Sequence, residues 1–227
     1  MPGGRCYRDL MAKPGDFTRA RERMVERQLR RRGIEDERVL EAMAAVPREA
    51  FVPEEVRSHA YDDSALPIGH EQTISQPWVV AAICQALALT GSERVLEIGT
   101  GSGYSTAVLA RLAAEVISLE RIPELGEAAR EHLRELGVAN AEVIVADGSR
   151  GQPGGPYDAI AVHAATPEAP HSLLAQLADE GRLVVPIATG SVDMLTLFVR
   201  GPDGMRQQII GPCRFVPLIG TEGFSER

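Results

Sequence analysis

One short run of this chain has the residue types of a ligand-binding turn. In Glu97-Ile-Gly99-Thr-Gly101-Ser-Gly103, glycine stands at every second position, and a backbone without side chains lets a ligand approach closely. The run lies between a predicted strand, residues 94–98, and a predicted helix, residues 103–113. Open α/β sheets bind ligands at the carboxyl ends of their strands, near the point where the strand order reverses. We therefore expect a ligand at this turn.

Acidic residues at three successive predicted strand ends indicate which ligand it is. Glu97 precedes the first glycine, Glu120 ends the second strand, and Asp147-Gly148 follow the third. A dinucleotide fingerprint has the spacing Gly-x-Gly-x-x-Gly, and a carboxylate at Glu97 would repel a pyrophosphate. The same carboxylate suits the ammonium or sulfonium of S-adenosylmethionine. Glu120 is placed for ribose hydroxyls and Asp147 for an adenine amine, so the pattern favours S-adenosylmethionine.

Further stretches along the chain carry a family resemblance. They are Arg32-Gly-Ile34, Pro47-Arg-Glu-Ala-Phe-Val-Pro53, Ala60-Tyr-Asp62, Leu66-Pro-Ile-Gly69, Gln72-Thr-Ile-Ser-Gln-Pro77, Val95-Leu-Glu-Ile-Gly-Thr-Gly-Ser-Gly-Tyr104, Glu120-Arg121, Tyr157-Asp158 and Phe215-Val-Pro-Leu218. Together they resemble the protein-L-isoaspartate (D-aspartate) O-methyltransferase family from about residue 23 to residue 224. The glycine motif is shared with many methyltransferases, whereas the Thr-Ile-Ser-Gln-Pro and Phe-Val-Pro-Leu stretches are much more specific.

The resemblance implies a reaction and a set of site residues. The reaction is methyl transfer from S-adenosylmethionine to the free carboxylate of L-isoaspartyl residues in damaged proteins and peptides, whose ester then cyclises to a succinimide. Ser75 is implied as the active-site residue. The cofactor-binding residues are expected to be Thr73, Ile74, Ser75, Glu97, Gly99, Thr100, Gly101, Ser102, Gly103, Glu120, Arg121, Asp147 and Gly148. The substrate-binding residues are expected to be Thr73, Ser75, His163, Ala164, Ala165 and Val216, with no metal.

This chemistry needs no general base. A carboxylate has a pKa of about 4 and is already an anionic nucleophile at neutral pH. Catalysis would come from holding it in line with the methyl group and from excluding water. We expect Ser75 to orient the carboxylate through its hydroxyl. Ser75 could also cap the helix that begins near Pro77, and the two roles are compatible.

Two departures from the family pattern leave the acceptor less defined than the cofactor. His70-Glu71 precede the Gln-Thr-Ile-Ser stretch, and His163-Ala-Ala-Thr166 stand where the family has threonine and alanines. His163 is either a partly buried, satisfied histidine or a group that touches substrate, and Glu71 is expected to face solvent. The alternatives are a paralogous carboxyl methyltransferase with another acceptor, a non-catalytic binding protein, and a nucleic-acid methyltransferase that uses the arginine-rich first helix.

The composition of the chain indicates which classes of binding partner to expect. The 227 residues carry a formal net charge of -8, which opposes binding to phosphate-rich nucleic acid. The arginines of residues 19–32 alternate with Glu22 and Glu26 and are typical of a solvated, ion-paired helix face. Three distant cysteines form no disulfide framework or metal spacing, and no membrane-spanning run is present. We expect a cytoplasmic monomer that acts on isoaspartyl proteins and peptides, without nucleic-acid or membrane partners.

Alternating elements must position these residues. Helices are expected over residues 18–32, from Asp36 to Pro47, and over 78–89, 103–113, 123–136 and 171–178. Strands are expected over 94–98, 116–120, 142–146, 157–162 and 182–187, and a final hairpin over 194–199 and 207–210 around Gly201-Pro-Asp-Gly204. This order predicts a Rossmann-like, doubly wound α/β fold. Its mainly parallel seven-stranded sheet would have helices on both faces and an antiparallel hairpin at the C-terminal edge, while the order of the last strands stays open.

The N-terminal part differs in character from the rest. Residues 1–17 are expected to form a flexible tail, in which either Met1 or Met11 can be the true start. Residues 18–227 are expected to form one methyltransferase domain. Within it, residues 18–77 would supply N-terminal helices and a proline-punctuated lid over substrate and cofactor, and residues 78–227 would form the Rossmann-like core.

Overall fold

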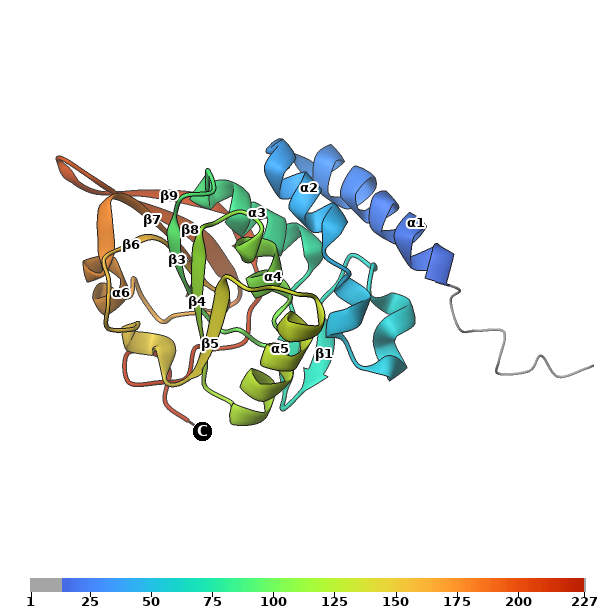
Figure 1. Ribbon diagram of the computed structural model, residues 1–227. Helices are drawn as coiled ribbons and strands as arrows, with labels where there is room; N and C mark the ends of the chain where they lie inside the picture. The colour runs from blue at the N-terminus through green and yellow to red at the C-terminus, as the bar shows by residue number, and fades with distance from the viewer. Residues whose placement is uncertain (1–13, 227) are drawn as a thin grey trace, which may run out of the picture.

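A seven-stranded sheet forms the centre of the protein (Figure 1), whose computed structural model describes residues 14–226. Its strands are β3 (Arg94–Ile98), β4 (Glu115–Glu120), β5 (Ala141–Val145), β6 (Tyr157–Val162), β7 (Leu177–Ala188), β8 (Asp193–Gly201) and β9 (Gly204–Cys213). Their order is β5-β4-β3-β6-β7-β8-β9. The run from β5 to β7 is parallel, and β8 and β9 add the expected antiparallel hairpin. The predicted fold class is confirmed, and β9 is the edge strand.

The central strands are apolar along their length because both sheet faces are covered. Successive side chains of β3 alternate between two apolar clusters. Val95 belongs to the cluster that also contains buried residues of α2 (Glu37–Ala45), α3 (Pro77–Leu87), α4 (Tyr104–Ala110) and α5 (Pro123–Glu135). Leu96 and Ile98 belong to the other, with Leu173 of α6 (His171–Ala175) and Leu218 near the C-terminus. The chain passes from β3 to β4 and β5 on one side, then returns to place β6 on the other. The carboxyl ends of β3 and β6 are therefore the switch point.

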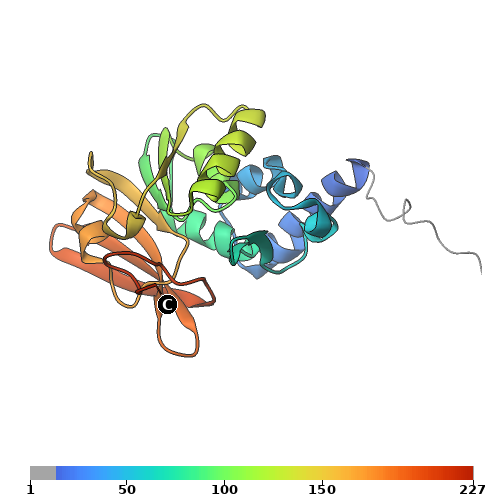
Figure 2. The same cartoon turned by 90° about the horizontal axis from the view of Figure 1, so that it is seen from below.

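The N-terminal helices form a separate group beside α3 (Figures 1 and 2). Helix α1 (Pro14–Met24) continues through a π-helical turn (Val25–Leu29) and a 3-10 turn (Arg30–Arg32) to Gly33, which ends it with a φ of +88°. The helix thus starts at Pro14, four residues before the expected start at residue 18, and the expected tail is shortened accordingly. The rest of that tail, with Met11, lies outside the described residues.

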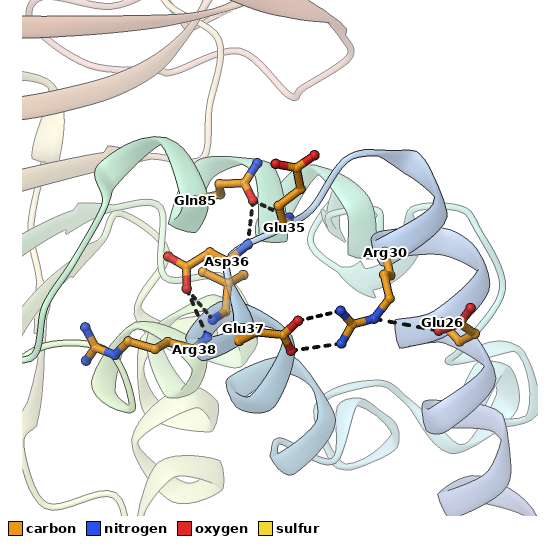
Figure 3. Close-up of polar contacts among 8 residues, drawn as sticks. Glu26, Arg30, Glu35, Asp36, Glu37, Arg38 and Gln85 are labelled. Atoms are coloured by element: carbon orange, nitrogen blue, oxygen red, sulfur yellow. Dashed lines mark hydrogen bonds and ion pairs between the residues drawn. The ribbon is translucent and has the colours of Figure 1, made fainter.

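Asp36 begins α2 as predicted (Figure 3). Its Oδ1 accepts the amides of Arg38 and Val39, 2.9 and 3.4 Å away. Gln85 of α3 binds the residues just before α2, since its Oε1 accepts the amides of Glu35 and Asp36 at 2.7 and 3.0 Å. The N-terminal group is thereby joined to the core by hydrogen bonds as well as by apolar packing.

Arginines near the end of the first helix form ion pairs. Arg30 lies 3.7 Å from Glu26, one turn earlier, and 2.5 Å from Glu37 of the next helix (Figure 3). Arg31 also approaches Glu26, with 3.4 Å between nitrogen and oxygen. These exposed pairs match the expected ion-paired helix face.

Residues 47–77 contain more regular structure than the sequence indicates. The 3-10 helices η4 (Arg48–Phe51) and η5 (Glu54–His59) precede a small antiparallel hairpin of β1 (Leu66–Gly69) and β2 (Gln72–Ile74). Its turn was not foreseen because His70 and Glu71, with φ values of +50° and +59°, are unusual residues for the left-handed region. Within residues 47–77, the apolar residues Phe51, Val52, Tyr61 and Leu66 are buried, and Ile68 is partly buried.

Helix α6 covers only His171–Ala175, shorter than the expected 171–178, because β7 already begins at Leu177. β7 thus begins well before the expected strand over 182–187, and the other core elements lie within a few residues of their predicted bounds. No helix within residues 14–226 has the length and apolarity needed to cross a bilayer.

Candidate active site

A pocket opens at the carboxyl ends of β3 and β6, where the switch point predicts it. Its walls come from the loop after β2, the glycine turn after β3, the ends of β4 and β5, the residues after β6, and the segment after β9. Thirteen of the predicted site residues line it: Thr73, Ile74, Ser75, Gly99, Thr100, Gly101, Ser102, Glu120, Arg121, Gly148, His163, Ala164 and Val216. Four do not: Glu97, Gly103, Asp147 and Ala165.

The glycine turn is held by backbone hydrogen bonds and by a carboxylate. The amides of Gly99 and Thr100 both donate to the Leu119 carbonyl, at 2.8 and 3.2 Å. Gly101 has a φ of +55° and donates its amide to Glu120 at 2.8 Å. Gly103, with a φ of +89°, faces away from the pocket, and a Cβ there would lie 3.2 Å from that of Ala129. Gly103 therefore serves the packing of the turn against α5, while Gly101 serves the ligand side.

Glu120 is a pre-oriented acceptor in the pocket wall. Only 6% of its surface is exposed. Oε2 accepts the Gly101 amide and Oε1 accepts the Ile122 amide at 2.9 Å. Each carboxylate oxygen offers about two acceptor positions, so both can take a further hydrogen bond from a ligand hydroxyl. This arrangement agrees with the ribose-binding role expected for Glu120.

Glu97 differs from its expected place. It is fully buried beneath the turn, where Thr106 Oγ1 and Ser118 Oγ donate to its Oε2 at 2.5 and 2.6 Å. Oε1 lies 3.2 Å from His163 Nε2. Because α4 and β4 supply hydroxyls to this carboxylate, it turns inward and does not reach the pocket. Its effect on a ligand passes through its neighbours, since Ser118 also bonds to Thr100, which does line the pocket.

The surroundings of Glu97 keep it ionised. Burial raises the pKa of its carboxyl, but the His163 imidazole, followed by the Ser118 and Thr106 hydroxyls, outweighs burial and holds the pKa below the ordinary 4.5. His163 is itself only 8% exposed and lines the pocket. Neither ring nitrogen of His163 has a hydrogen-bond partner among the described residues, so the satisfied histidine is not what the structure has, and contact with substrate stays a prediction.

Asp147 also lies off the pocket. Its Oδ1 accepts the Ser149 amide at 2.9 Å, and its Oδ2 accepts the amide and hydroxyl of Thr221 at 2.9 and 3.0 Å. Burial raises the pKa of Asp147, but these amides outweigh it and the pKa is lowered. The carboxylate expected to receive an adenine amine therefore anchors the C-terminal segment, and Gly148 is the residue of the pair that faces the pocket.

Ser75 lies half-buried in the loop between β2 and α3. Its hydroxyl forms no hydrogen bond with the described residues, and the N-cap position of α3 is held by Gln76, without a side-chain cap. The capping role considered for Ser75 is therefore wrong, and its hydroxyl is free for a ligand. Glu71 faces solvent, as expected.

Ten lining residues were not singled out from the sequence: Gln72, Val80, Ile98, Tyr104, Ser105, Leu119, Ile122, Pro217, Leu218 and Ile219. Val80, Ile98 and Leu119 are apolar residues inside a helix or strands, where a site residue and a core residue have the same pattern. Gln72 and Pro217-Leu218 lie in the family-specific stretches, and that place was a usable signal.

Comparison with known proteins gives one consistent family. The model of the family described as Protein-L-isoaspartate(D-aspartate) O-methyltransferase (PCMT) matches residues 19–223. A Protein-L-isoaspartate O-methyltransferase 1 of Rhodopseudomonas palustris is 54% identical over 212 residues, 92% of this chain and 86% of the relative. The protein of the same name from Syntrophobacter fumaroxidans is 52% identical over 210 residues, 92% of this chain and 98% of the relative.

Solved structures agree. A protein-L-isoaspartate O-methyltransferase with 30% identity superposes with a TM-score of 0.79 over 89% of this chain and 66% of that one. The Plasmodium falciparum structure, titled as a putative protein-L-isoaspartate O-methyltransferase in complex with S-adenosyl-L-homocysteine, has 27% identity and a TM-score of 0.76. That likeness covers 88% of this chain and 98% of the other.

Proposed function

The chain belongs to the protein-L-isoaspartate(D-aspartate) O-methyltransferase family, and we propose that Ser75 and the pocket around it perform the family's reaction in this protein. The protein transfers a methyl group from S-adenosylmethionine to the free carboxylate of L-isoaspartyl residues in damaged proteins and peptides. One observation carries the assignment of residues: the Thr73–Ser75 loop and the glycine turn with Glu120, far apart in sequence, line a single pocket.

The pocket residues fit S-adenosylmethionine. Glu120 keeps acceptor positions for ribose hydroxyls after binding two backbone amides. Gly101 and Gly148 leave backbone surface without side chains, and a Cβ at Gly148 would lie 2.8 Å from Ile98 Cγ2. When bound, the cofactor supplies an electrophilic methyl group on a sulfonium.

The acceptor needs to be positioned and does not need to be deprotonated. An isoaspartyl carboxylate has a pKa of about 4, so it arrives as the nucleophile. The free hydroxyl of Ser75 donates a hydrogen bond to one carboxylate oxygen and leaves the other directed at the methyl group. His163 and Ala164 line the same pocket, and the buried Ala165 donates its amide to the carbonyl of Val216, another lining residue. Holding two reactants in line can lower a barrier by about 7–11 kcal/mol in favourable cases, which is the main contribution that this site can make.

The lid function belongs to the same proposal. Residues 18–77 cover the pocket through the β1–β2 hairpin, and Ile68 of β1 lies next to Gly101, 3.3 Å from the position of a Cβ there. Apolar residues Ile74, Val216 and Leu218 line the pocket on the acceptor side. Together they limit the water that reaches the methyl group, so that the carboxylate is the nucleophile that meets it.

The proposal also includes the cellular compartment, the class of acceptor and the oligomeric state of the protein. Cys84 and Cys213 are free and buried, as suits a reducing cytoplasm. The net charge of -8 favours peptide over nucleic-acid acceptors. The protein is proposed to act as a monomer, and elution as a 24.5 kDa species in size-exclusion chromatography tests this.

The test pairs two peptides with two variants. Methyl-labelled S-adenosylmethionine is incubated with peptides that differ only in isoaspartate or aspartate at one position. We expect base-labile label on the isoaspartyl peptide alone. Ser75→Ala removes one hydrogen bond to a charged group, about 1.5–3 kcal/mol, and should lower kcat about 10- to 150-fold. Ser64→Ala, an exposed serine of the same region, is the control. Full turnover by Ser75→Ala would refute the role of Ser75.

A further inference from the structure

A second hollow adjoins the cofactor pocket, and Ser75 lines both. Its other walls come from three separate segments. Arg32 lies at the end of the first helices, Trp78 in the first turn of α3, and Arg214 and Phe215 just after β9. The last segment continues into the cofactor pocket, where Val216 is a lining residue. The two hollows are therefore parts of one continuous surface that meets at the proposed acceptor-orienting serine.

One wall of this hollow is fixed by a compact set of contacts. Arg32 NH1 donates to both carboxylate oxygens of Asp63, at 3.0 and 2.8 Å. Its guanidinium lies 5.2 Å from the centre of the Trp78 ring, and the Trp78 indole donates to the Arg32 carbonyl at 3.1 Å. Gln76 donates to the same Asp63 carboxylate at 2.6 Å. The indole and guanidinium are thus held in place before any ligand binds.

The other wall carries an available positive charge. Arg214 is exposed and has no acidic partner within 4 Å among the described side chains of residues 17–226. Its backbone is held nonetheless, because the amide of the next residue, Phe215, donates to Asp193 at 2.8 Å. Within the described part of the chain no carboxylate lines the hollow, whereas two guanidiniums do. Because Arg32 is paired with Asp63, the uncompensated positive charge of this hollow is that of Arg214.

We propose that this hollow, the flanking subsite, binds the polypeptide next to the isoaspartyl residue and prefers an acidic residue there. The inference rests on the proposed function, since it takes the isoaspartyl carboxylate to lie at Ser75. An extended chain advances about 3.3–3.6 Å per residue, so a neighbour of the isoaspartate bound at Ser75 enters the adjoining hollow. There Arg214 attracts a carboxylate and repels an ammonium, while Trp78 and Phe215 contact the peptide's apolar atoms.

The experiment compares isoaspartyl peptides that carry Glu, Gln or Lys beside the isoaspartate, varied on each side in turn. For one side we expect kcat/KM to fall in the order Glu, Gln, Lys. An exposed charge pair changes binding modestly, so the Glu-to-Lys ratio should be about three- to tenfold at low salt. The ratio should shrink as ionic strength rises, because the charges are exposed.

Two variants distinguish a local effect of Arg214 in the flanking subsite from an effect of the protein's net charge. Arg214→Gln should bring the Glu-to-Lys ratio close to one. Arg206→Gln changes the net charge equally, but Arg206 is an exposed residue of β9 outside the hollow, so it should keep the wild-type ratio.

The outcomes are distinct. Equal kcat/KM for the three peptides, or a preference that survives in Arg214→Gln, overturns the flanking subsite while isoaspartyl methylation itself stands. A preference lost equally in Arg206→Gln also overturns it, since the effect would then come from net charge. Methylation of no isoaspartyl peptide would refute the proposed function, and the subsite with it.

Discussion

Replacing Glu120 by Gln should weaken cofactor binding far more than the loss of one charge on the surface would. The two oxygens of Glu120 each accept a different backbone amide, from Gly101 and Ile122. Gln has one oxygen and one NH2 group in their place. Whichever way the amide turns, a donor faces a donor, and one of the two backbone amides loses its partner.

The magnitude follows from these contacts. A hydrogen bond to a charged group contributes about 1.5–3 kcal/mol, and an orphaned buried donor costs about 1–3 kcal/mol. We therefore expect the free energy of unfolding to fall by about 1–3 kcal/mol. The variant also loses a charged acceptor for a ribose hydroxyl, about 1.5–3 kcal/mol, which corresponds to a rise of about 10- to 150-fold in the Kd for S-adenosylhomocysteine.

Isothermal titration with S-adenosylhomocysteine measures the Kd, and urea unfolding measures the stability. Glu127→Gln is the matched control, because Glu127 is an exposed glutamate of α5 that does not line the pocket. A Kd within threefold of wild type for Glu120→Gln, with unchanged stability, would show that the carboxylate neither holds the turn nor contacts the cofactor.

Two further predictions concern the buried support of the site. Because the pKa of Glu97 is lowered in the folded state, its stabilising contribution is present above the ordinary value of 4.5 and is lost as the pH falls through the folded pKa. The free energy of unfolding, measured in urea, should thus decline as the pH is lowered below 4.5, and it should decline less steeply in Glu97→Gln. The same pH dependence in both proteins would contradict a lowered pKa at Glu97. Gly103→Ala places a Cβ 3.2 Å from that of Ala129 in a left-handed conformation, whereas Gly137→Ala at φ +68° meets nothing within 4 Å. Left-handed strain alone costs about 1–2 kcal/mol, so Gly103→Ala should lose more stability in urea than Gly137→Ala, and equal losses would rule out tight packing at Gly103.

The central sheet could be predicted from the sequence because its signals are local. Residues 94–98 and 157–162 are short apolar runs bounded by turns, and the structure has strands with those bounds. Asp36 could be identified as a helix cap for the same reason, since a cap acts on amides two or three residues away. The β1–β2 hairpin could not, because its turn places His70 and Glu71 in a conformation that neither residue prefers.

The polar site residues also divide into those placed by local sequence signals and those placed by contacts that form only on folding. Ser75, Glu120 and the glycine turn line one pocket, since strand-end positions and motif spacing determine where the backbone passes. Glu97 and Asp147 stand at equivalent strand ends, yet both carboxylates are taken by other parts of the chain. Thr106, Ser118 and His163 surround the first, and Thr221 binds the second.

The sequence by itself therefore determined the fold class, the cofactor turn and the family, because each is encoded in short-range patterns of glycine, charge and apolar residues. Only the tertiary structure decided which carboxylates face the ligand, where β9 lies, and that a hollow with two guanidiniums opens beside Ser75. The physical reason is that a carboxylate turns toward the donors that reach it. Those donors come from segments such as Thr221, 74 residues along the chain from Asp147, that only folding brings near.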